Sequence, residues 1–190
     1  MKYNNHWELA GKHAYLSPSS GAWINYDSEK MINYYQNKLK KEEGTYLHEL
    51  ASMLIKTRKR LANQKNAFNQ FVNDAIGFRM ESEITLFYSN NIFGTADALL
   101  YKEAEKHLQI HDLKTGLKDA PFRQLDIYSA LFCLEYNINP FETTFEERIY
   151  QGKGYKDNFP DPTNIRAIMD KIITLDQIIT NERATYEGII

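Results

Sequence analysis

Ile92-Phe-Gly-Thr-Ala-Asp-Ala-Leu-Leu-Tyr101 and His107-Leu-Gln-Ile-His-Asp-Leu-Lys114 are two strand-like runs rich in apolar residues, separated by a charged turn at 102–106. Runs of this kind predict the two strands of an antiparallel hairpin. Residues 83–88 show the same alternation, and Asn90-Asn91 suits a two-residue turn because asparagine tolerates positive φ. The three runs together predict an antiparallel meander.

The register of the second hairpin follows from its turn. A turn centred between residues 104 and 105 makes Tyr101 face Leu108 and makes Asp97 face Asp112. Facing side chains project to one side of the sheet with Cβ atoms roughly 4.5–5.5 Å apart. Alternation along the strand places Lys114 on that side as well. We therefore expect two carboxylates and an ammonium group side by side.

The first hairpin is predicted to agree with this arrangement. With Asn90-Asn91 as its turn, Tyr88 faces Phe93 and Ile84 faces Asp97. The apolar residues of all three strands then share one face. On that face we expect Phe93, Leu99, Tyr101, Leu108 and Ile110.

Charged groups on an apolar face are costly unless they are paired, and two close carboxylates repel each other. A hard divalent cation such as Mg²⁺ or Mn²⁺ resolves both problems, because it prefers carboxylate oxygens as ligands. Such an ion polarises a phosphate and lowers the pKa of bound water, and a neighbouring lysine stabilises developing negative charge. The group predicts phosphodiester hydrolysis. The alternative is an ordinary ion pair, since Asp-x-Lys triplets are common by chance.

The remaining elements follow from spacing, caps and turns. Apolar spacing predicts a helix over 28–42, and Gly44-Thr45 is interpreted as a break that starts a second helix with Thr45 as its cap. Further elements are expected as helices over about 66–77, 120–136 and 162–184, a strand over 143–150 and a polar loop over 152–160. We predict a single domain, 1–190, with an N-terminal helical segment 1–43, a core 44–150 and a C-terminal helix 161–185.

Composition narrows the functional classes. The 190 residues are 43% hydrophobic and 25% charged, which is ordinary for a globular domain. No apolar run approaches the roughly 20 residues of a membrane span, so we expect no membrane association and a cytoplasmic setting. Cys133 is the only cysteine, so this chain alone forms no disulfide framework and no iron–sulfur cluster. The net charge of −2 argues against a surface uniformly basic for nucleic acid.

Four short motifs occur in order along the chain. They are Gly44-x-x-x-His48, Gly94-x-x-Asp97, Asp112-x-Lys114 and Gln124-x-x-x-Tyr128. Together they resemble the PD-(D/E)xK nuclease superfamily, in particular its RecB-like exonuclease branch, which includes phage recombination exonucleases and the mitochondrial genome-maintenance exonuclease. The resemblance spans about residues 44–150. Ala96 stands before Asp97 where the superfamily's name has proline, a position often altered in this branch.

The resemblance implies a restriction-endonuclease-like α/β fold, with a central mixed sheet of four to five strands flanked by helices. It implies a catalytic group of Asp97, Asp112 and Lys114. It also implies metal ligands, which would be His48, Asp97, Asp112 and the backbone carbonyl of Leu113. Gln124 and Tyr128 would brace the site or touch DNA; the alternative for this pair is a polar contact at the edge of the core.

Cofactor, substrate and context are implied in the same way. Mg²⁺ or Mn²⁺ would be the cofactor and DNA the substrate, in phage or prophage recombination or repair, with a recombination protein or further copies of the chain as partners. Exonucleolytic cleavage is expected ahead of site-specific endonucleolytic cleavage. Lys56, Arg58 and Arg60 form a basic cluster that would bind the phosphate backbone, unless they belong to a solvated helix face. The rival classes are a DNA-binding module that does not cut and a recombination accessory protein.

Overall fold

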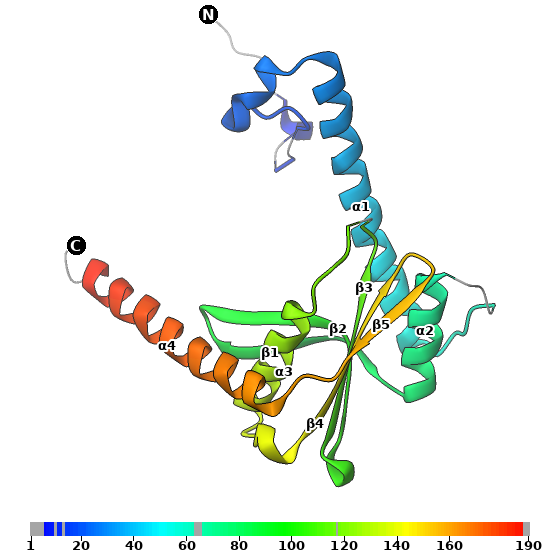
Figure 1. Cartoon of the computed structure of the whole chain (residues 1–190). Coiled ribbons are helices and arrows are strands. Elements are labelled where there is room, and N and C mark those ends of the chain that lie inside the picture. The colour runs from blue at the N-terminus through cyan, green and yellow to red at the C-terminus, as the bar shows by residue number, and fades with distance from the viewer. Residues whose placement is uncertain (1–5, 10, 13, 63–65, 117, 188–190) are drawn as a thin grey trace, which may run out of the picture. The chain divides into compact units, whose positions relative to one another are not determined.

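We describe a computed structural model of the chain, which covers residues 6–9, 11–12, 14–62, 66–116 and 118–187 (Figure 1). The internal contacts divide the chain into residues 1–43 and residues 44–190. The long helix α1 (Ser28–Lys56) contributes to both units.

The N-terminal unit consists of two short 3-10 helices, η1 (Trp7–Leu9) and η2 (Pro18–Asn25), and the first half of α1. The hydroxyl of Tyr15 donates to the carboxylate of Glu42 at 3.0 Å, which ties the turn-rich segment to the helix. The Trp23 indole N–H donates to the carbonyl of Ser17 at 2.8 Å. The first five residues of the predicted N-terminal segment lie outside the described residues.

The second unit is built on a five-stranded sheet in the order β1-β2-β3-β4-β5. The strands are β1 (Glu81–Ser89), β2 (Ile92–Lys102), β3 (His107–Lys114), β4 (Thr144–Gln151) and β5 (Gly154–Asn158). All neighbours pair antiparallel except β3 and β4, which are parallel and joined through α3 (Arg123–Glu135) and the short helix η4 (Pro140–Glu142). The predicted class, an α/β domain with a mixed sheet flanked by helices, is confirmed.

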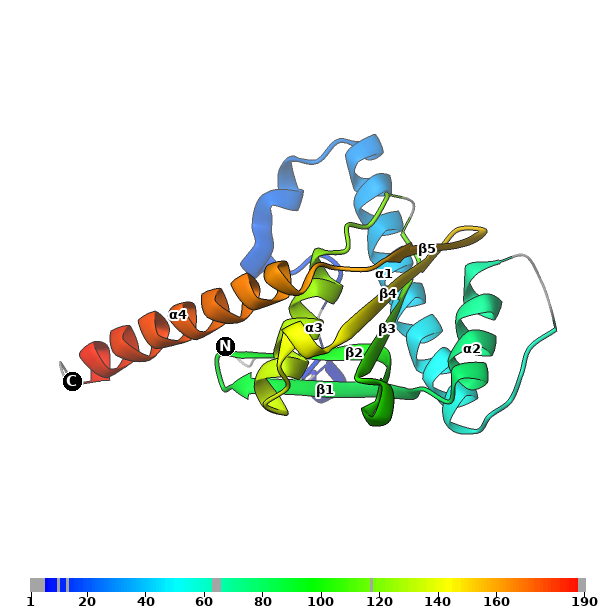
Figure 2. The same cartoon turned by 60° about the horizontal axis from the view of Figure 1, so that its bottom comes forward.

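Helices cover both faces of the sheet (Figure 2). On one face, Leu108, Ile110 and Ile149 form a core with α3 and α4 (Pro162–Glu187). On the other face, Leu113 and Tyr150 form a core with the second half of α1 and with α2 (Ala67–Phe78). Burying one such apolar side chain stabilises the fold by about 1.5–3 kcal/mol. Because both faces of β3 are buried, its polar residues need partners inside the fold.

The hairpin of β2 and β3 has the predicted register. Tyr101 pairs with Leu108, and Leu99 pairs with Ile110. The intervening turn is the 3-10 helix η3 (Glu103–Glu105), which ends at Lys106 with φ +47. This hairpin brings Asp97 and the end of β3 together.

The predicted register of the first hairpin is wrong. Ile84 pairs with Ala96 and not with Asp97, and Phe93 pairs with Phe87 and not with Tyr88. The cause is a shift of one residue between Phe87 and Ser89, next to the Asn90-Asn91 turn. A bulge of this kind places two residues of one strand opposite one residue of the other.

The prediction that apolar residues of the three strands share one face is confirmed except for Phe93, which is exposed. Leu99, Tyr101, Leu108 and Ile110 lie in or against the core beside α3, as do Ile84, Leu86 and Tyr88 of β1.

The alternation along β2 is nevertheless irregular near Asp97. Ala96 belongs to the core beside α3, whereas Ala98 belongs to the core beside α1 and α2. Regular alternation would place both on the same face. The irregularity lies where Glu83, with φ +56, stands across from Asp97 between two regular pairs. The carboxylate of Asp97 therefore sits at a distorted point of the sheet.

The predicted helix break at Gly44-Thr45 is wrong, because α1 continues through both residues. Gly44 is buried there, and a Cβ at this position would lie 2.9 Å from Oγ1 of Thr115. The glycine therefore serves a close approach between α1 and the segment that follows β3, and Thr45 is not a cap. A long helix can accommodate the roughly 1 kcal/mol that an interior glycine costs.

The predicted polar loop over 152–160 is wrong for most of its length, because residues Gly154–Asn158 form β5. This strand forms a hairpin with β4 around Gly152 at φ +65. The other predicted helices and strands agree within a few residues. The crossover helix α3 begins at Arg123, a few residues after the predicted start at about residue 120. Among the described residues, no helix is long and apolar enough to cross a bilayer.

Gly44→Ala is expected to miss the stabilisation that alanine normally brings to a helix. Alanine is favoured over glycine in a helix interior by about 1 kcal/mol. Here the added methyl group must displace the Thr115 hydroxyl, which lies 2.9 Å from the Cβ position. The double variant Gly44→Ala/Thr115→Ala should recover the gain, as measured by chemical denaturation. A single variant already more stable than the wild type by the full helical increment would contradict the contact.

Candidate functional site

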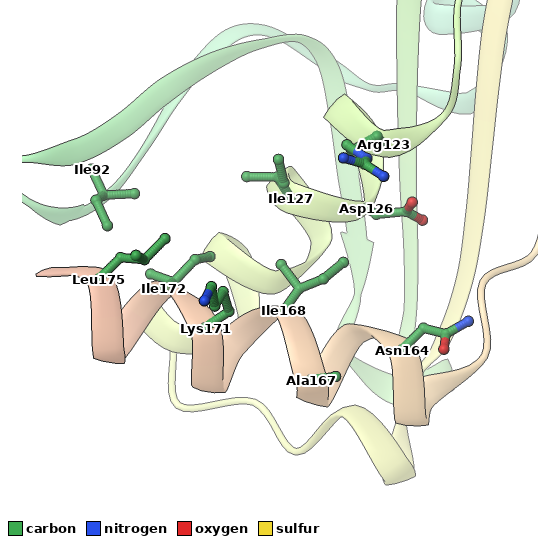
Figure 3. A pocket seen from close by; sticks show the side chains of 10 residues that line it. All are labelled: Ile92, Arg123, Asp126, Ile127, Asn164, Ala167, Ile168, Lys171, Ile172 and Leu175. Carbon is green, nitrogen blue, oxygen red and sulfur yellow. The ribbon is translucent and has the colours of Figure 1, made fainter.

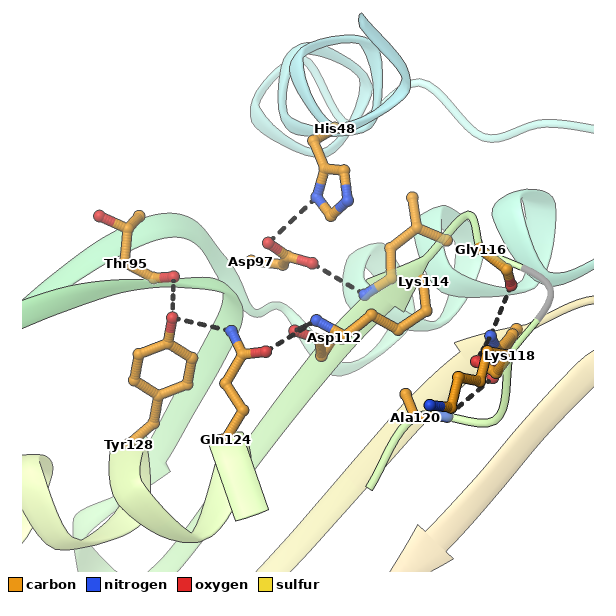
Figure 4. A network of polar contacts seen from close by, with 12 residues as sticks. His48, Thr95, Asp97, Asp112, Lys114, Gly116, Lys118, Ala120, Gln124 and Tyr128 are labelled. Atoms are coloured by element: carbon orange, nitrogen blue, oxygen red, sulfur yellow. Dashed lines mark hydrogen bonds and ion pairs between the residues drawn. The ribbon is translucent and has the colours of Figure 1, made fainter. Parts of the chain in front are cut away.

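Asp97 of β2 lies at the centre of a row of polar side chains (Figure 4). Its Oδ1 lies 3.1 Å from Nδ1 of His48, which projects from the part of α1 that belongs to the second unit. Its Oδ2 accepts the backbone N–H of Leu113 at 2.8 Å. One carboxylate thus joins a helix to the end of β3, and the predicted neighbours His48, Asp97 and Leu113 are brought together.

Asp112 and Lys114 continue the row. Nζ of Lys114 lies 3.0 Å from Oδ1 and 2.9 Å from Oδ2 of Asp112. The same ammonium donates to Oε1 of Gln124 in the first turn of α3 at 2.8 Å. Lys114 is therefore held between a carboxylate on its own strand and an amide from the crossover helix. The predicted catalytic lysine has a fixed position.

Tyr128 anchors the amide that holds this lysine. Nε2 of Gln124 donates to the Tyr128 hydroxyl at 3.1 Å, and that hydroxyl donates to the carbonyl of Thr95 at 2.7 Å. The tyrosine ring passes so close to β2 that a Cβ on Gly94 would lie 3.0 Å from its Cε1. The predicted pair Gln124 and Tyr128 thus braces Lys114, and Gly94 leaves room for the brace.

Burial dominates the electrostatics of Asp112. Its side chain is almost fully buried, at 4% exposure. Burial and the nearby charge of Asp97 raise the pKa of Asp112 to about 6, although Lys114 opposes the shift. Oδ2 of Asp112 is buried without a well-directed hydrogen bond from a described residue. Oδ2 is nevertheless paired with the Lys114 ammonium at 2.9 Å, so the charge of this buried carboxylate is balanced by the lysine.

His48 lies at the end of the row formed by α1, whereas Gln124 and Tyr128 of α3 lie at the other end. The hydrogen bond to Asp97 raises the pKa of His48, and the charges of Asp97, Asp112 and Glu83 act in the same direction against burial. His48, Lys56 and Glu83 line a hollow of about 600 Å³. Partial burial and the charge of Asp97 raise the pKa of Glu83. The Glu83 side chain is exposed and lies beside the site.

The donor set suits a hard divalent cation. Two carboxylates and an imidazole are available, and one buried carboxylate oxygen lacks a proper hydrogen bond. In the part of the chain that the structure describes, no three His, Cys, Asp or Glu side chains already surround a common point. The carboxylates instead contact His48 and Lys114. Binding a cation would exchange some of these contacts for oxygen–metal bonds, which is an ordinary property of carboxylate ligands.

The structure separates the three predicted phosphate-binding cations. Lys56 lines the hollow beside His48. The guanidinium of Arg58 donates to the carbonyl of Met80 at 3.2 Å and lies 3.5 Å from Glu81. Arg60 lines a different hollow, together with Asp74. Of this cluster, only Lys56 lies beside His48.

Gln151 at the end of β4 is a residue that sequence reasoning missed. Its side-chain amide donates to the carbonyls of Gly116 and Lys118 at 2.6 and 2.8 Å. Its Oε1 accepts the backbone N–H of Ala120 at 3.4 Å. These contacts hold the segment that follows Lys114 (Figure 4). A lone glutamine at a strand end carries no sequence signal, because its role depends on which backbone lies opposite.

Comparison with known proteins gives no further assignment: no family model matches the chain, and no curated protein matches it either.

Proposed function

We propose that the chain is a metal-dependent nuclease that hydrolyses phosphodiester bonds in DNA, with strand ends as its preferred points of attack. The observation that carries the proposal is that two contact groups lie side by side: His48 with Asp97, and Asp112 with Lys114 and Gln124. The charge of Asp97 acts on the buried Asp112 across the gap between them. Two neighbouring carboxylates, one of them buried, beside a positioned ammonium group suit metal-assisted phosphoryl chemistry.

Asp97 and Asp112 would hold Mg²⁺ or Mn²⁺, with His48 and the carbonyl of Leu113 as further ligands. The bound ion would supply charge stabilisation at the phosphate and a water molecule of lowered pKa. The donor types and the nearness of the two carboxylates, through which Asp97 raises the pKa of the buried Asp112, support this assignment. The chain carries a single cysteine, so the proposal includes no iron–sulfur cluster.

Lys114 would stabilise negative charge on the phosphate or orient the attacking water. Its ammonium is held 2.8 Å from Gln124, so little conformational freedom is lost when the substrate arrives. Asp112 fixes the same ammonium from the other side. Tyr128 acts through Gln124 and is a positioning residue.

The motif resemblance supports the same proposal. Four motifs separated in sequence contribute to one region: Gly44 and His48 from α1, Asp97 from β2, Asp112 and Lys114 from β3, and Gln124 and Tyr128 from α3. We therefore propose membership of the PD-(D/E)xK superfamily, a restriction-endonuclease-like fold and a role in phage or prophage DNA recombination or repair.

The proposal is tested by incubating the purified chain with end-labelled linear DNA and with closed circular DNA of the same sequence. Linear DNA should be degraded when Mg²⁺ or Mn²⁺ is added and should stay intact in EDTA. Circular DNA should resist, which separates an end-dependent enzyme from a site-specific endonuclease. DNA that is bound but left uncut with either metal would instead identify a binding module, and the nuclease proposal would fail.

A further inference from the structure

The C-terminal half of α4 carries large apolar side chains that the core of its unit does not cover (Figure 1). Earlier in the helix, Ile165 and Ile172 are buried in the core beside α3. Farther along, Leu175, Ile178 and Ile179 are 42%, 52% and 42% exposed. The apolar pattern of the helix therefore continues past the end of the core. A contiguous exposed apolar surface of this kind marks an interaction site.

The beginning of this exposed surface is hollowed into a groove. The groove encloses about 610 Å³ between α3 and α4 (Figure 3). Ile127 of α3 and Ile168 and Leu175 of α4 line it with apolar groups. Arg123 and Asp126 supply one charge of each sign at its other end. Because Leu175 belongs to both, the groove and the exposed part of the helix form one continuous surface.

Four residues of α4 give this surface a pattern. Lys171, Leu175, Ile178 and Glu182 follow one another at intervals of four, three and four residues, so they lie on one side of the helix. We call this stripe the α4 face. It begins with a cation, continues with two apolar residues and ends with an anion. Neither charge has an ion-pair partner among the described residues.

Another side of the same helix is held by the β1–β2 turn. The side-chain amide of Asn91 donates to Oδ1 of Asp176 at 2.9 Å. The guanidinium of Arg183 donates to Oδ1 of Asn91 at 2.8 Å. These bonds fix the exposed half of α4 against the sheet, so the α4 face is presented on an anchored helix.

A second copy of the chain is complementary to the α4 face. Consider two α4 helices that pack antiparallel about a two-fold axis. In the register that sets Lys171 of each copy opposite Glu182 of the other, Leu175 lies opposite Ile178, because both pairs share one midpoint. Every contact then forms twice, since a two-fold interface is isologous. Parallel packing about a two-fold axis would instead set each charge against its own kind.

Nucleic acid matches the α4 face less well than a second copy does. One lysine and one glutamate leave the stripe without net charge, whereas the phosphate backbone selects surfaces rich in lysine and arginine. An unrelated protein would have to present the reverse order of charges. A second copy presents that order by symmetry alone.

We infer that the α4 face pairs with the α4 face of a second copy, so that the chain forms an antiparallel two-fold dimer. The end of each helix then lies over the groove of the other copy. Tyr186, which is 74% exposed, supplies an aromatic ring for that contact. The inference goes beyond the proposed nuclease function and does not depend on it.

Charge reversal tests the pairing. Light scattering and sedimentation in EDTA, without DNA, measure the mass and the dissociation constant. The wild type should have twice the mass of one chain and should dissociate on dilution. Lys171→Glu and Glu182→Lys each bring like charges together at both ends of the interface, so each should dimerise about tenfold more weakly or worse. A mixture of the two variants should dimerise as tightly as the wild type, because every facing pair is again a lysine and a glutamate.

Ile178→Glu places a carboxylate at the centre of the interface and should abolish the dimer. Ile32→Glu is the matched control, because it makes the same replacement on α1 at an isoleucine that is 56% exposed. It should leave the mass unchanged. Thermal unfolding checks that each variant keeps the fold.

Three results would overturn the inference. They are a wild-type chain that stays monomeric at its highest soluble concentration, a dimer that survives Ile178→Glu, and a mixture of charge variants that is no tighter than either variant alone. For a monomer, oligonucleotide binding that is lost in Lys171→Glu would assign the face to nucleic acid instead. Because dimerisation is measured without DNA or metal, its failure leaves the nuclease proposal unaffected, and a chain that cuts no DNA can still form the dimer.

Discussion

Asp112→Asn and Lys114→Ala should each reduce DNA cleavage by about 10²–10³-fold or more while the protein stays folded. Asp112 loses the charge that would hold the cation, and Lys114 loses the ammonium group held between Asp112 and Gln124. The change is measured as the initial rate of release from end-labelled linear DNA in Mg²⁺ or Mn²⁺. Both variants should remove the same chemical step, so the double variant should lose little beyond either single one.

Stability separates a catalytic loss from unfolding. The pKa of Asp112 is raised by burial and by Asp97, so the ionised side chain destabilises the metal-free fold. Asp112→Asn should therefore have a melting temperature equal to or above that of the wild type. Lys106→Ala and Glu142→Gln serve as matched controls, because they break an exposed ion pair at the opposite end of β3. Cleavage at the wild-type rate by both site variants would reject the assignment.

Glu147→Gln should make the protein more stable than the wild type at pH 8 while having little effect at pH 4. Glu147 is fully buried on β4, where Ser129 and Asn158 donate to its carboxylate at 2.9 Å. Burial and the neighbouring carboxyl of Asp126 raise the pKa of Glu147 to about 7. The two acids share one environment, so ionisation of both is unfavourable.

The direction of this pH effect on stability follows from how many protons the folded and unfolded chains bind. Below pH 4.5 the group is protonated in both states and imposes no penalty. Between pH 4.5 and about 7 the unfolded chain loses the proton while the folded chain keeps it, so the free energy of unfolding falls as pH rises. The difference between Glu147→Gln and the wild type should grow by about 3 kcal/mol across this window.

Urea denaturation at a series of pH values measures this difference. Glu142→Gln is the contrasting control, because hydrogen bonds from Lys106 and Asn139 lower the pKa of Glu142, and its pH effect has the opposite sign. A stability difference between Glu147→Gln and the wild type that stays constant from pH 4 to 8 would show that Glu147 titrates normally in the folded chain.

Short-range patterns in the sequence were sufficient to predict β3, its hairpin with β2 and the grouping of Asp97, Asp112 and Lys114. A hairpin depends on its turn and on side-chain alternation, and both are properties of adjacent residues. The motif order placed His48, Gln124 and Tyr128 in the same group. In the structure His48 contacts Asp97, and Gln124 and Tyr128 brace Lys114.

Other features depended on contacts between distant segments. In the sequence Gly44 looks like a helix break, but its role is to allow the close approach of Thr115, which is distant in sequence. Likewise, residues 154–158 form β5 because the edge of β4 is available to pair with them. One bulge near the β1–β2 turn moved Phe93 to a partner that alternation had not predicted.

The difference between the features that could be predicted and those that could not lies in how far apart in the sequence the interacting residues are. The sequence by itself determined which residue types meet in the β2–β3 hairpin, because that pairing is local. Only the tertiary structure decided how far Asp112 is buried, which amide holds Lys114, and that Tyr128 bonds the carbonyl of Thr95. The crossover helix α3 sets these positions, and it is distant in sequence from β2.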